Sequence, residues 1–427
     1  MSEGKKNMPK RRFKEFQNAD AWEQRKWSDI FITLPNNSLS RAELNTEDGL
    51  IKDVHYGDVL IKYGEVLDVS KEEIPYILNH KYQCNNAALL QNGDVIIADA
   101  AEDETVGKCS EIAGLSNQKI LSGLHTIPCR PIKNFSRGYL GYYMNSGSYH
   151  DQLLPLIQGT KISSISKSAM KHTNIVYPNV EEQEQIGAFF TSIDNLITLH
   201  QRKLEKIKLL KSAYLSEMFP SEGEYKPKRR FAGFTDAWEQ RKLRELGESF
   251  EYGLNAAAME FDGEHKYIRI TDIDDSSRLF LDSDLTSPNI DLSNADNYKL
   301  KYGDILFART GASVGKSYIY RDYDGLVYYA GFLIRARIKK EFDPEFVFYN
   351  TLTNEYNQYI RITSQRSGQP GVNAQEYAEY EIKIPIYEEQ VKIGAFMRQL
   401  DNLITLHQRK LDKLQNIKKA YLNEMFI

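Results

Sequence analysis

The sequence of 427 residues has few cysteines and no long hydrophobic run. Its three cysteines, Cys84, Cys109 and Cys129, show no C-x-x-C spacing and cannot all pair. This argues against a disulfide framework or a zinc site and suits a reducing cytoplasm. No apolar stretch approaches the roughly 20 residues of a membrane-spanning helix, and the basic start MSEGKKNMPKRRFK lacks the apolar core of a secretory signal. We therefore expect a cytoplasmic protein without a membrane segment.

The sequence also lacks the positive charge that is usual for a stand-alone nucleic-acid-binding protein. It has 55 Lys and Arg against 59 Asp and Glu, a formal net charge of −4. Positive charge is instead local, at residues 5–14 and again at 226–230. Such runs form either solvated tails and linkers or interaction segments. The sequence leaves both interpretations open.

Several catalytic signatures are missing. Without a Pro-Pro dipeptide there is no Asp/Asn-Pro-Pro-aromatic motif of adenine-amino methyltransferases, and neither H-E-x-x-H nor G-x-G-x-x-G occurs. The stretch GASVGKS from Gly311 is similar to a phosphate-binding loop, but Thr310 stands where that loop requires its first glycine. Glu381-Ile382-Lys383 spells the E-x-K of many nucleases without a preceding Pro-Asp. An enzyme is therefore only an alternative interpretation.

A tandem duplication is the main feature that the sequence does contain. The stretch DNLITLHQRKL begins at Asp194 and returns unchanged 207 positions later. Around it, residues 186–219 and 393–426 share 23 identities in 34 positions. A second repeated segment, PKRRF followed by DAWEQRK, occurs in 9–26 and again in 227–242. The chain therefore consists of two halves, each with a basic start, a long middle and a closing segment.

The closing segments carry apolar residues at alternating steps of four and three, which is typical of a coiled-coil seam. Pro178, Pro385 and Pro220 mark their boundaries. We predict two long helices that pair in antiparallel orientation through a seam of Ile193, Ile197, His200, Leu204, Ile207, Leu400, Ile404, His407, Leu411 and Leu414. Polar seam residues, such as the two histidines, fix register at a cost in stability. A catalytic or metal-binding role for the histidines is the alternative.

The middles of the two halves differ, but they share two landmarks. NGDVIIADAAEDETVGKCSEI begins at Asn92 and YGDILFARTGASVGKSYIY at Tyr302. Each reads as a Gly-Asp turn, a strand, an irregular loop and Val-Gly-Lys before another strand. A strand, a proline and a helix start then precede each long helix. The loop with Arg309 and Lys316 suits contact with a polynucleotide backbone or base edge, unless it is a plain turn.

These observations predict an α+β protein with two globular mixed α/β domains. The domains are separated by two long antiparallel coiled-coil helices, in a tandem repeat with pseudo-twofold symmetry. The predicted parts are a basic N-terminal segment at 1–24, a first domain at 25–180, a central helix at 181–219, a basic linker at 220–242, a second domain at 243–387 and a C-terminal helix at 388–427.

Together the motifs resemble one known family, the specificity (S) subunit of Type I restriction-modification systems. The resemblance covers essentially the whole chain. It is carried by both copies of DAWEQRK, by GDILFARTGASVGK from Gly303, by the run from Ile384 that enters the second helix, and by both copies of DNLITLHQRKL. The first half departs from the pattern, with Val176-Tyr177-Pro178 in place of Ile-Pro.

The resemblance implies a non-catalytic reader of double-stranded DNA, in which each target recognition domain reads one half of a split site. Two methyltransferase (M) subunits and restriction (R) subunits are the implied partners. S-adenosylmethionine, ATP and Mg²⁺ are expected on those partners, and no cofactor or metal on this chain. The candidate DNA-binding residues are Arg309, Thr310, Gly311, Ser313, Lys316, Lys108, Lys161, Arg366, Ser367 and Gln369. The alternative is a scaffold whose helices join two protein-binding modules without DNA.

Overall fold

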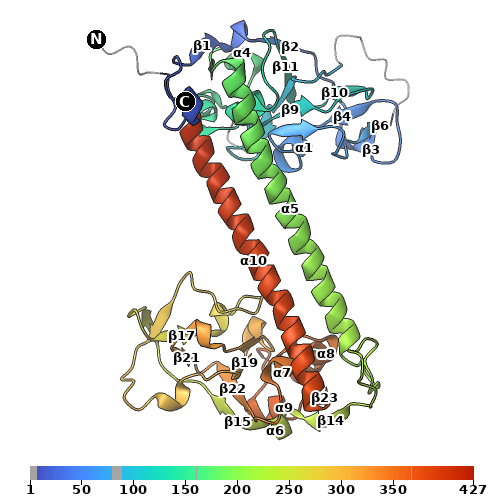
Figure 1. Cartoon of the computed structure of the whole chain (residues 1–427), viewed down its shortest axis with the longest axis vertical. Helices are drawn as coiled ribbons and strands as arrows, with labels where there is room; N and C mark the ends of the chain where they lie inside the picture. Colours follow the sequence, from blue (N-terminus) through green and yellow to red (C-terminus); the bar gives the residue numbers. More distant parts are fainter. Residues whose placement is uncertain (1–6, 79–88, 160, 367) are drawn as a thin grey trace. The chain divides into compact units, whose positions relative to one another are not determined.

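The repeated closing segments form the two longest helices of the protein (Figure 1). Helix α5 spans Val180–Met218 and helix α10 spans Tyr387–Met425, 39 residues each. Both begin one residue before the predicted start; α5 ends one residue, and α10 two residues, before the predicted end. The structure is a computed structural model that describes residues 7–78, 89–159, 161–366 and 368–427.

The repeated basic segment anchors the start of each long helix. Arg12 donates through Nε and Nη2 to Glu182 at 2.8 and 2.6 Å. Arg230 donates in the same way to Glu389, again at 2.8 and 2.6 Å. The two carboxylates are only 1% and 0% exposed. The interpretation of these arginines as part of a solvated tail or linker is therefore wrong, because each makes a bidentate ion pair inside the fold.

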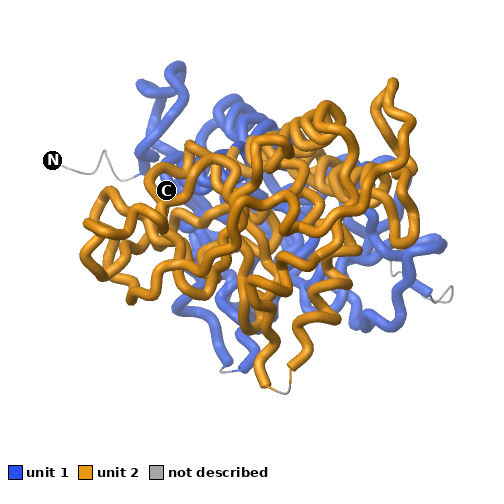
Figure 2. The backbone as a smooth tube through the Cα atoms, turned by 90° about the horizontal axis from the view of Figure 1, so that it is seen from below, with its two compact units in different colours: residues 1–200, 410–427 blue, residues 201–409 orange. Residues whose placement is uncertain are grey.

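The chain divides into two compact units, which Figure 2 colours separately. Unit 1 comprises residues 1–200 and 410–427, and unit 2 comprises residues 201–409. Unit 1 therefore holds the start of α5 and the end of α10, whereas unit 2 holds the end of α5 and the start of α10. In the part of the chain that the structure describes, no helix is long and apolar enough to cross a membrane.

Unit 1 is built on two sheets and two short ribbons. Its strands are Glu23–Lys26 (β1), Phe31–Thr33 (β2), Leu44–Asn45 (β3), Lys52–Val54 (β4), Val66–Asp68 (β5), Tyr76–Ile77 (β6), Val95–Ala98 (β7), Ala100–Ala101 (β8), Cys109–Ala113 (β9), Ile120–Ser122 (β10), Thr126–Pro131 (β11), Ser163–Ser164 (β12) and Asn174–Tyr177 (β13). The sheets have the orders β2-β11-β7-β9-β5 and β10-β4-β6-β3, and the ribbons are β1-β13 and β12-β8. Its shorter helices are Tyr56–Ile61 (α1), Tyr139–Met144 (α2), Gly147–His150 (α3) and Lys167–Met170 (α4).

Unit 2 is built on one sheet and three ribbons. Its strands are Glu239–Lys242 (β14), Gly247–Tyr252 (β15), Ala258–Glu260 (β16), Lys266–Ile268 (β17), Thr286–Pro288 (β18), Ile305–Ala308 (β19), Ser317–Ile319 (β20), Val327–Tyr329 (β21), Leu333–Ile338 (β22) and Glu381–Ile384 (β23). The sheet has the order β15-β22-β19-β20, and the ribbons are β14-β23, β16-β18 and β17-β21. Its shorter helices are Leu243–Leu246 (α6), Pro344–Asn350 (α7), Asn354–Thr363 (α8) and Ala374–Ala378 (α9).

The two units share one framework. In both, the strand made by the repeated Glu-Gln-Arg-Lys pairs antiparallel with the strand before a long helix, as β1-β13 and β14-β23. The strand after the Gly-Asp turn pairs antiparallel with the later long strand, as β7-β11 and β19-β22. Each unit also contains a parallel pair, β4-β10 and β17-β21. The repeat in the sequence is therefore a repeat of the fold, and the predicted mixed α/β architecture is confirmed.

Each unit packs one end of each long helix into its core. In unit 1 the Phe190 ring stacks at 5.7 Å on Phe426, which directly follows α10, and Asp194 pairs with Lys418 at 2.7 Å. In unit 2, Lys211 pairs with Asp401 at 2.6 Å. Tyr214 and Phe396 of unit 2 lie 4.9 Å apart. Within each unit, positions that rise along α5 face positions that fall along α10, so the predicted antiparallel orientation is confirmed.

The predicted seam positions lie on the covered faces of these helices. Ile193, Leu204, Leu400 and Leu411 are buried, whereas Ile197, His200, Ile207, Ile404, His407 and Leu414 are half-buried. Four leucines of the repeated stretch are instead between 43% and 45% exposed, namely Leu196, Leu199, Leu403 and Leu406. The role of the seam in setting register stays a prediction.

Candidate nucleic-acid interface

The glycine-rich loop of unit 2 joins β19 to β20 and is closed by its own backbone. Ala308 N donates to Lys316 O at 2.8 Å. On its other side, Thr310 forms an antiparallel bridge with Gly371. The structure thereby brings the glycine-rich loop next to Pro370 and Gly371, which directly follow the candidate residue Gln369.

Arg309 of this loop lies over an aromatic ring. Its guanidinium carbon is 4.9 Å from the centroid of Tyr252, which is a cation–π distance. Its backbone N–H donates to Phe332 O at 3.1 Å. Arg309, Tyr252 and Phe332 line a cavity of about 610 Å³ together with Arg269. Tyr252 is 43% exposed and Phe332 is 59% exposed. A guanidinium beside exposed aromatic rings is suited to base edges and to stacked bases.

The corresponding loop of unit 1, between β7 and β9, has the same backbone frame. Ala98 N donates to Lys108 O at 2.9 Å, which is the equivalent of the hydrogen bond from Ala308 to Lys316. Strand β8, within this loop, pairs with β12. Asp99 N donates to His125 O at 3.0 Å, just as Arg309 N donates to Phe332 O. Asp99 and His125 therefore occupy the positions that Arg309 and Phe332 occupy in unit 2.

A tyrosine accompanies each of these pairs. In unit 1 the Tyr56 and His125 rings are in edge-to-face contact, with their centroids 5.3 Å apart. The ring of the buried His55 also contacts Tyr56, at a centroid distance of 4.6 Å. In unit 2 the tyrosine is Tyr252. We call Tyr56, Asp99 and His125 the unit 1 triplet, and Tyr252, Arg309 and Phe332 the unit 2 triplet.

The two triplets have opposite hydrogen-bonding character. Asp99 Oδ1 lies 3.3 Å from His125 Nδ1, and burial raises the pKa of the Asp99 carboxyl while the imidazole opposes that rise. His125 has a φ of 55°, a left-handed conformation that L-residues seldom adopt. Unit 1 thus presents an acceptor and an imidazole, where unit 2 presents a donor, Arg309, and an apolar ring, Phe332.

Two candidate lysines do not belong to this interface. Lys316 Nζ donates to Ile273 O at 3.0 Å and pairs with Asp275 at 2.5 Å. Lys108 Nζ donates to Leu60 O at 2.6 Å, and burial lowers the pKa of its ammonium group. Both ammonium groups are turned into the fold to hold a neighbouring segment, so we remove Lys316 and Lys108 from the candidate set.

The other candidates lie at three places in the fold. Thr310, Gly311 and Ser313 are half-buried in the glycine-rich loop, whereas Gln369, beyond α8, and Lys161, just before β12 of unit 1, are exposed. Arg366 is exposed but partly engaged, because it donates to Thr363 O at 2.7 Å and pairs with Glu376. Ser367 lies outside the described residues.

Sequence reasoning missed Asp99, His125, Tyr56, Tyr252 and Phe332. A signal existed for Asp99, since aligning GDVIIAD with GDILFAR sets it opposite Arg309. The other four come from segments that do not align between the halves. Only the folded chain places them, through backbone hydrogen bonds for His125 and Phe332 and through ring contacts for the two tyrosines.

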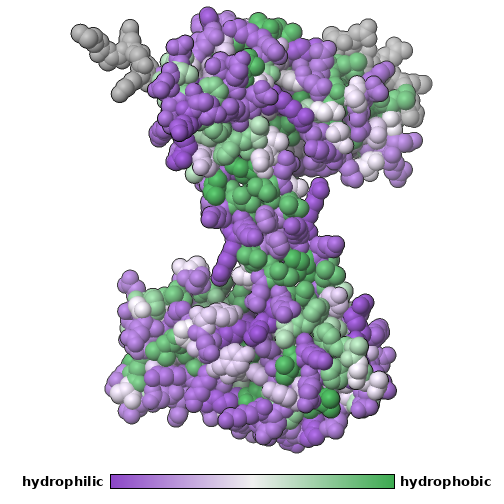
Figure 3. Space-filling model, viewed as in Figure 1, coloured by the Kyte–Doolittle hydropathy of each residue, from purple (hydrophilic) through white to green (hydrophobic). Residues whose placement is uncertain are grey.

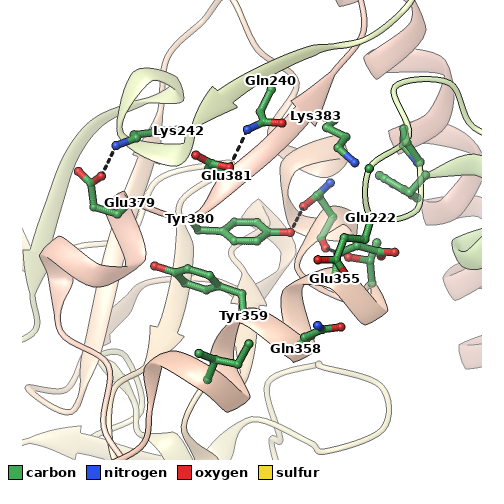
Figure 4. A pocket seen from close by; sticks show the side chains of 16 residues that line it. Glu222, Gln240, Lys242, Glu355, Gln358, Tyr359, Glu379, Tyr380, Glu381 and Lys383 are labelled. Carbon is green, nitrogen blue, oxygen red and sulfur yellow. Dashed lines mark hydrogen bonds and ion pairs between the residues drawn. The ribbon is translucent and has the colours of Figure 1, made fainter.

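The nuclease alternative finds no support at Glu381-Ile382-Lys383. Glu381 accepts from Gln240 at 2.6 Å and Lys383 donates to Ser221 O at 2.7 Å, beside a cavity of about 580 Å³ (Figure 4). Among the described residues, no group of three or more His, Cys, Asp or Glu side chains could hold a metal ion. The stretch from Gly311 to Gly315 also spells G-x-S-x-G, yet its serine has no histidine hydrogen-bonded to it in the described chain.

The framework and its two triplets define a protein with two related but chemically different candidate interfaces. The chain belongs to the Type I restriction modification DNA specificity domain family, which matches residues 20–209 and 235–416. It is 24% identical over 279 residues to the Type I restriction enzyme MjaVIII specificity subunit of Methanocaldococcus jannaschii. That alignment covers 62% of this chain and 64% of the relative, just under two thirds of its length.

Two further similarities span nearly the whole chain. The putative type I restriction enzyme MjaX specificity subunit of the same organism is 22% identical, with 94% of this chain and 92% of that protein covered. The crystal structure of the Type-I restriction-modification system S subunit from M. genitalium has a TM-score of 0.64 at 14% identity, covering 98% of this chain and 99% of that one. The structural likeness shows a shared fold.

Proposed function

We propose that this protein is the DNA specificity subunit of a Type I restriction-modification system, and that each unit reads one half of a two-part target. Membership of the family supports DNA as the ligand. The observation that carries the two-part reading is that Asp99 and His125 of unit 1 occupy the backbone positions of Arg309 and Phe332 in unit 2 but have opposite hydrogen-bonding character. Two identical half-sites would call for the same side chains in both units.

The chemistry of each triplet suggests what it reads in the major groove. Arg309 is suited to donate in a bidentate manner to O6 and N7 of guanine. Asp99, when ionised, can only accept hydrogen bonds, which matches the N4 amino group of cytosine. The aromatic rings beside both residues offer faces for contact with bases or their methyl groups.

We propose further that two M subunits dock on equivalent outer faces of the long helices. The exposed pair Leu196 and Leu199 in unit 1 has its counterpart in Leu403 and Leu406 of unit 2. Hydrophobic surface is visible over the helices in Figure 3. In this proposal the chain itself catalyses nothing: S-adenosylmethionine binds to the M subunits, and ATP and Mg²⁺ serve the R subunits.

The competing scaffold function makes a different prediction for DNA binding. The test is a gel shift with the chain assembled with its M partner, on a randomised duplex library whose bound fraction is sequenced. A specificity subunit retains duplexes that share two short motifs at a fixed distance. A scaffold retains no enriched sequence.

The docking proposal has its own control within the chain. Replacing Leu196 and Leu199 by serine should weaken binding of one M subunit in size-exclusion chromatography, and replacing Leu403 and Leu406 should weaken binding of the other. Replacing the exposed Leu209, which lies on α5 outside the eleven-residue repeat, should have no effect. Loss of both M subunits from either double variant would contradict docking on equivalent faces.

A further inference from the structure

In unit 1 a half-buried lysine of α10 lies between two acids. Lys418 Nζ lies 2.7 Å from Asp194 Oδ1 and 2.8 Å from Glu65 Oε2. Tyr142 donates its hydroxyl to Asp194 at 2.7 Å, and the lysine sits over the tyrosine ring at 5.5 Å. The ammonium group of Lys108 also interacts electrostatically with Glu65, so two carboxylates are balanced by two ammonium groups in this cluster.

Unit 2 contains the same cluster of lysine, aspartate and tyrosine, but without a counterpart of the Glu65 carboxylate. Lys211 of α5 lies 2.6 Å from Asp401 Oδ1 and 5.5 Å from the Tyr349 ring. Tyr349 donates to Asp401 at 2.6 Å. Arg278 lines the same cavity as Lys211 and Asp401, together with Lys208 and Asp275. Three cations face two carboxylates, one of which is also paired with Lys316, so the cavity has a surplus of positive charge.

Arg278 stands at the position that corresponds to Glu65. The two equivalent lysines of the loops, Lys108 and Lys316, donate to Leu60 O and Ile273 O respectively. Glu65 and Arg278 each follow that carbonyl by five residues. The carboxylate that satisfies the lysine in unit 1 is therefore replaced in unit 2 by a second cation.

The guanidinium of Arg278 forms no close ion pair with any described residue. Burial lowers the pKa of this guanidinium, and the nearby Asp275 and Asp274 only partly oppose that effect. The φ of 58° at Arg278 is a left-handed conformation in which glycine would be less strained. Such strain persists where the surroundings or a function require it.

The surrounding cavity suits an oxyanion. It has a volume of about 390 Å³ and is lined by the three cations and two carboxylates named above and by polar side chains that include Ser212, Asn357 and Thr405. Lys316 ties the loop that carries Arg278 to the end of the glycine-rich loop, through Ile273 O and Asp275. The cavity is therefore joined directly to the segment that we propose for reading DNA.

We propose that the cavity around Arg278 and Lys211 binds a phosphate group of the DNA backbone next to the half-site read by unit 2. Glu65 takes the place of that phosphate in unit 1, where no such contact forms. This inference rests on the proposed function, because DNA is the source of the phosphate. The contact adds affinity but carries no base specificity.

The test compares three variants of the chain assembled with its M partner. Arg278→Gly removes the charge in a conformation that glycine favours, so the fold is preserved. Arg278→Lys keeps the charge, and Lys340→Ala removes a charge from an exposed lysine elsewhere in unit 2. Kd for a duplex with the full target is measured over a range of salt concentrations, and the methylated motif is sequenced. In parallel, the chain is titrated with inorganic phosphate at constant ionic strength.

Arg278→Gly should raise Kd by roughly fivefold to tenfold at 0.15 M salt and flatten the slope of log Kd against log salt by about 0.9. Arg278→Lys should recover most of the affinity, Lys340→Ala should change little, and the methylated motif should stay the same. Inorganic phosphate should raise the melting temperature of the wild-type chain but not of Arg278→Gly.

Three outcomes would overturn the inference alone, with wild-type binding intact. The first is an unchanged Kd and an unchanged salt slope in Arg278→Gly. The second is an altered methylated motif in that variant. The third is loss of the M subunit from that variant, which would show that a carboxylate of the M subunit occupies the cavity. Failure of the wild-type assembly to select any two-part target would instead overturn the proposed function, and this inference with it.

Discussion

At the scale of the residue, strain coincides with the proposed ligand sites. His125 and Arg278 are the non-glycine residues with positive φ in the described chain. One belongs to the unit 1 triplet and the other to the phosphate cavity of unit 2. Positive φ costs free energy for an L-residue, and such residues cluster at functional sites because folding alone does not select them. This coincidence is independent of the charge arguments and agrees with them.

The first residue-scale prediction concerns Arg309. Replacing Arg309 by alanine should cost about 1–3 kcal/mol of DNA binding and relax the motif at one position of one half-site. The reason is the loss of two hydrogen bonds to a guanine edge. Competition binding with base-substituted duplexes measures both effects. Unchanged affinity together with an unchanged motif would return Arg309 to a structural role.

A second residue-scale prediction concerns pH and Asp53 on β4. Burial raises the pKa of this carboxyl from 3.8 to about 6, against a hydrogen bond from Asn37, and Asp53 Oδ1 has no hydrogen-bond partner among the described residues. A folded-state pKa above the unfolded value means that the folded state binds the proton more tightly. The resulting stability is present below about pH 4 and is lost as pH rises through about 6.

Asp53→Asn should remove this dependence. Between pH 4 and 6 the wild type should lose up to about 1.4 kcal/mol of unfolding free energy per pH unit relative to the variant. Urea denaturation at several pH values measures the difference, with exposed Asp48→Asn as the control. Parallel pH profiles for wild type and Asp53→Asn would contradict the account.

At the scale of the element, the repeated basic segments act as clamps on the long helices. Arg12 is 4% exposed and Glu182 is 1% exposed, so neither charge can be left unpaired without a desolvation cost. The adjacent pair of Arg11 and Glu424 is much more exposed, at 53% and 38%. Surface pairs of this kind contribute little because water and salt screen them.

Arg12→Ala should therefore destabilise unit 1 by about 3 kcal/mol, whereas Arg11→Ala should leave its unfolding curve nearly unchanged. Denaturation followed by the fluorescence of Trp22 and Trp27, which lie in the unit 1 core, measures both variants. Equal effects of the two substitutions would show that the buried pair is not the clamp.

The long helices carry a second element-scale prediction, if they set the distance between half-sites. Inserting four residues after Lys203, and four after the equivalent Lys410, should lengthen the pair by about 6 Å while nearly keeping the seam in phase. At 3.4 Å per base pair, the gap in the methylated motif should grow by one or two base pairs. Insertions of two residues put the seam out of phase and should abolish activity. An active four-residue variant with an unchanged gap would show that the helices are not the ruler.

At the scale of the whole molecule, the parts predictable from sequence are those that the duplication repeats. The long helices, their orientation within each unit and the common fold follow from apolar spacing and from repeated strands such as Glu-Gln-Arg-Lys. The interface was only partly predictable. Lys316 looked like a DNA contact because its side chain is basic, but its partner, Ile273 O, is a backbone carbonyl that no residue pattern reveals.

The triplets were hidden for a related reason. Asp99 and His125 meet through a backbone hydrogen bond between segments 26 residues apart, and their counterparts in unit 2 are chemically unlike them. When equivalent positions of the two units carry unlike side chains, only the folded chain shows that the positions are equivalent. It is also what a reader of two different half-sites requires.

The measurement that tests the central claim most directly is the methylated motif of a chain with one unit exchanged. The β1-β13 ribbon ends at the pair Lys26 and Asn174, so replacing residues 27–173 by the corresponding segment of a relative keeps the ribbon and both long helices. We predict that sequencing of methylated DNA will show one half-site replaced, with the other half-site unchanged. Changes in both half-sites, or in neither, would contradict the account.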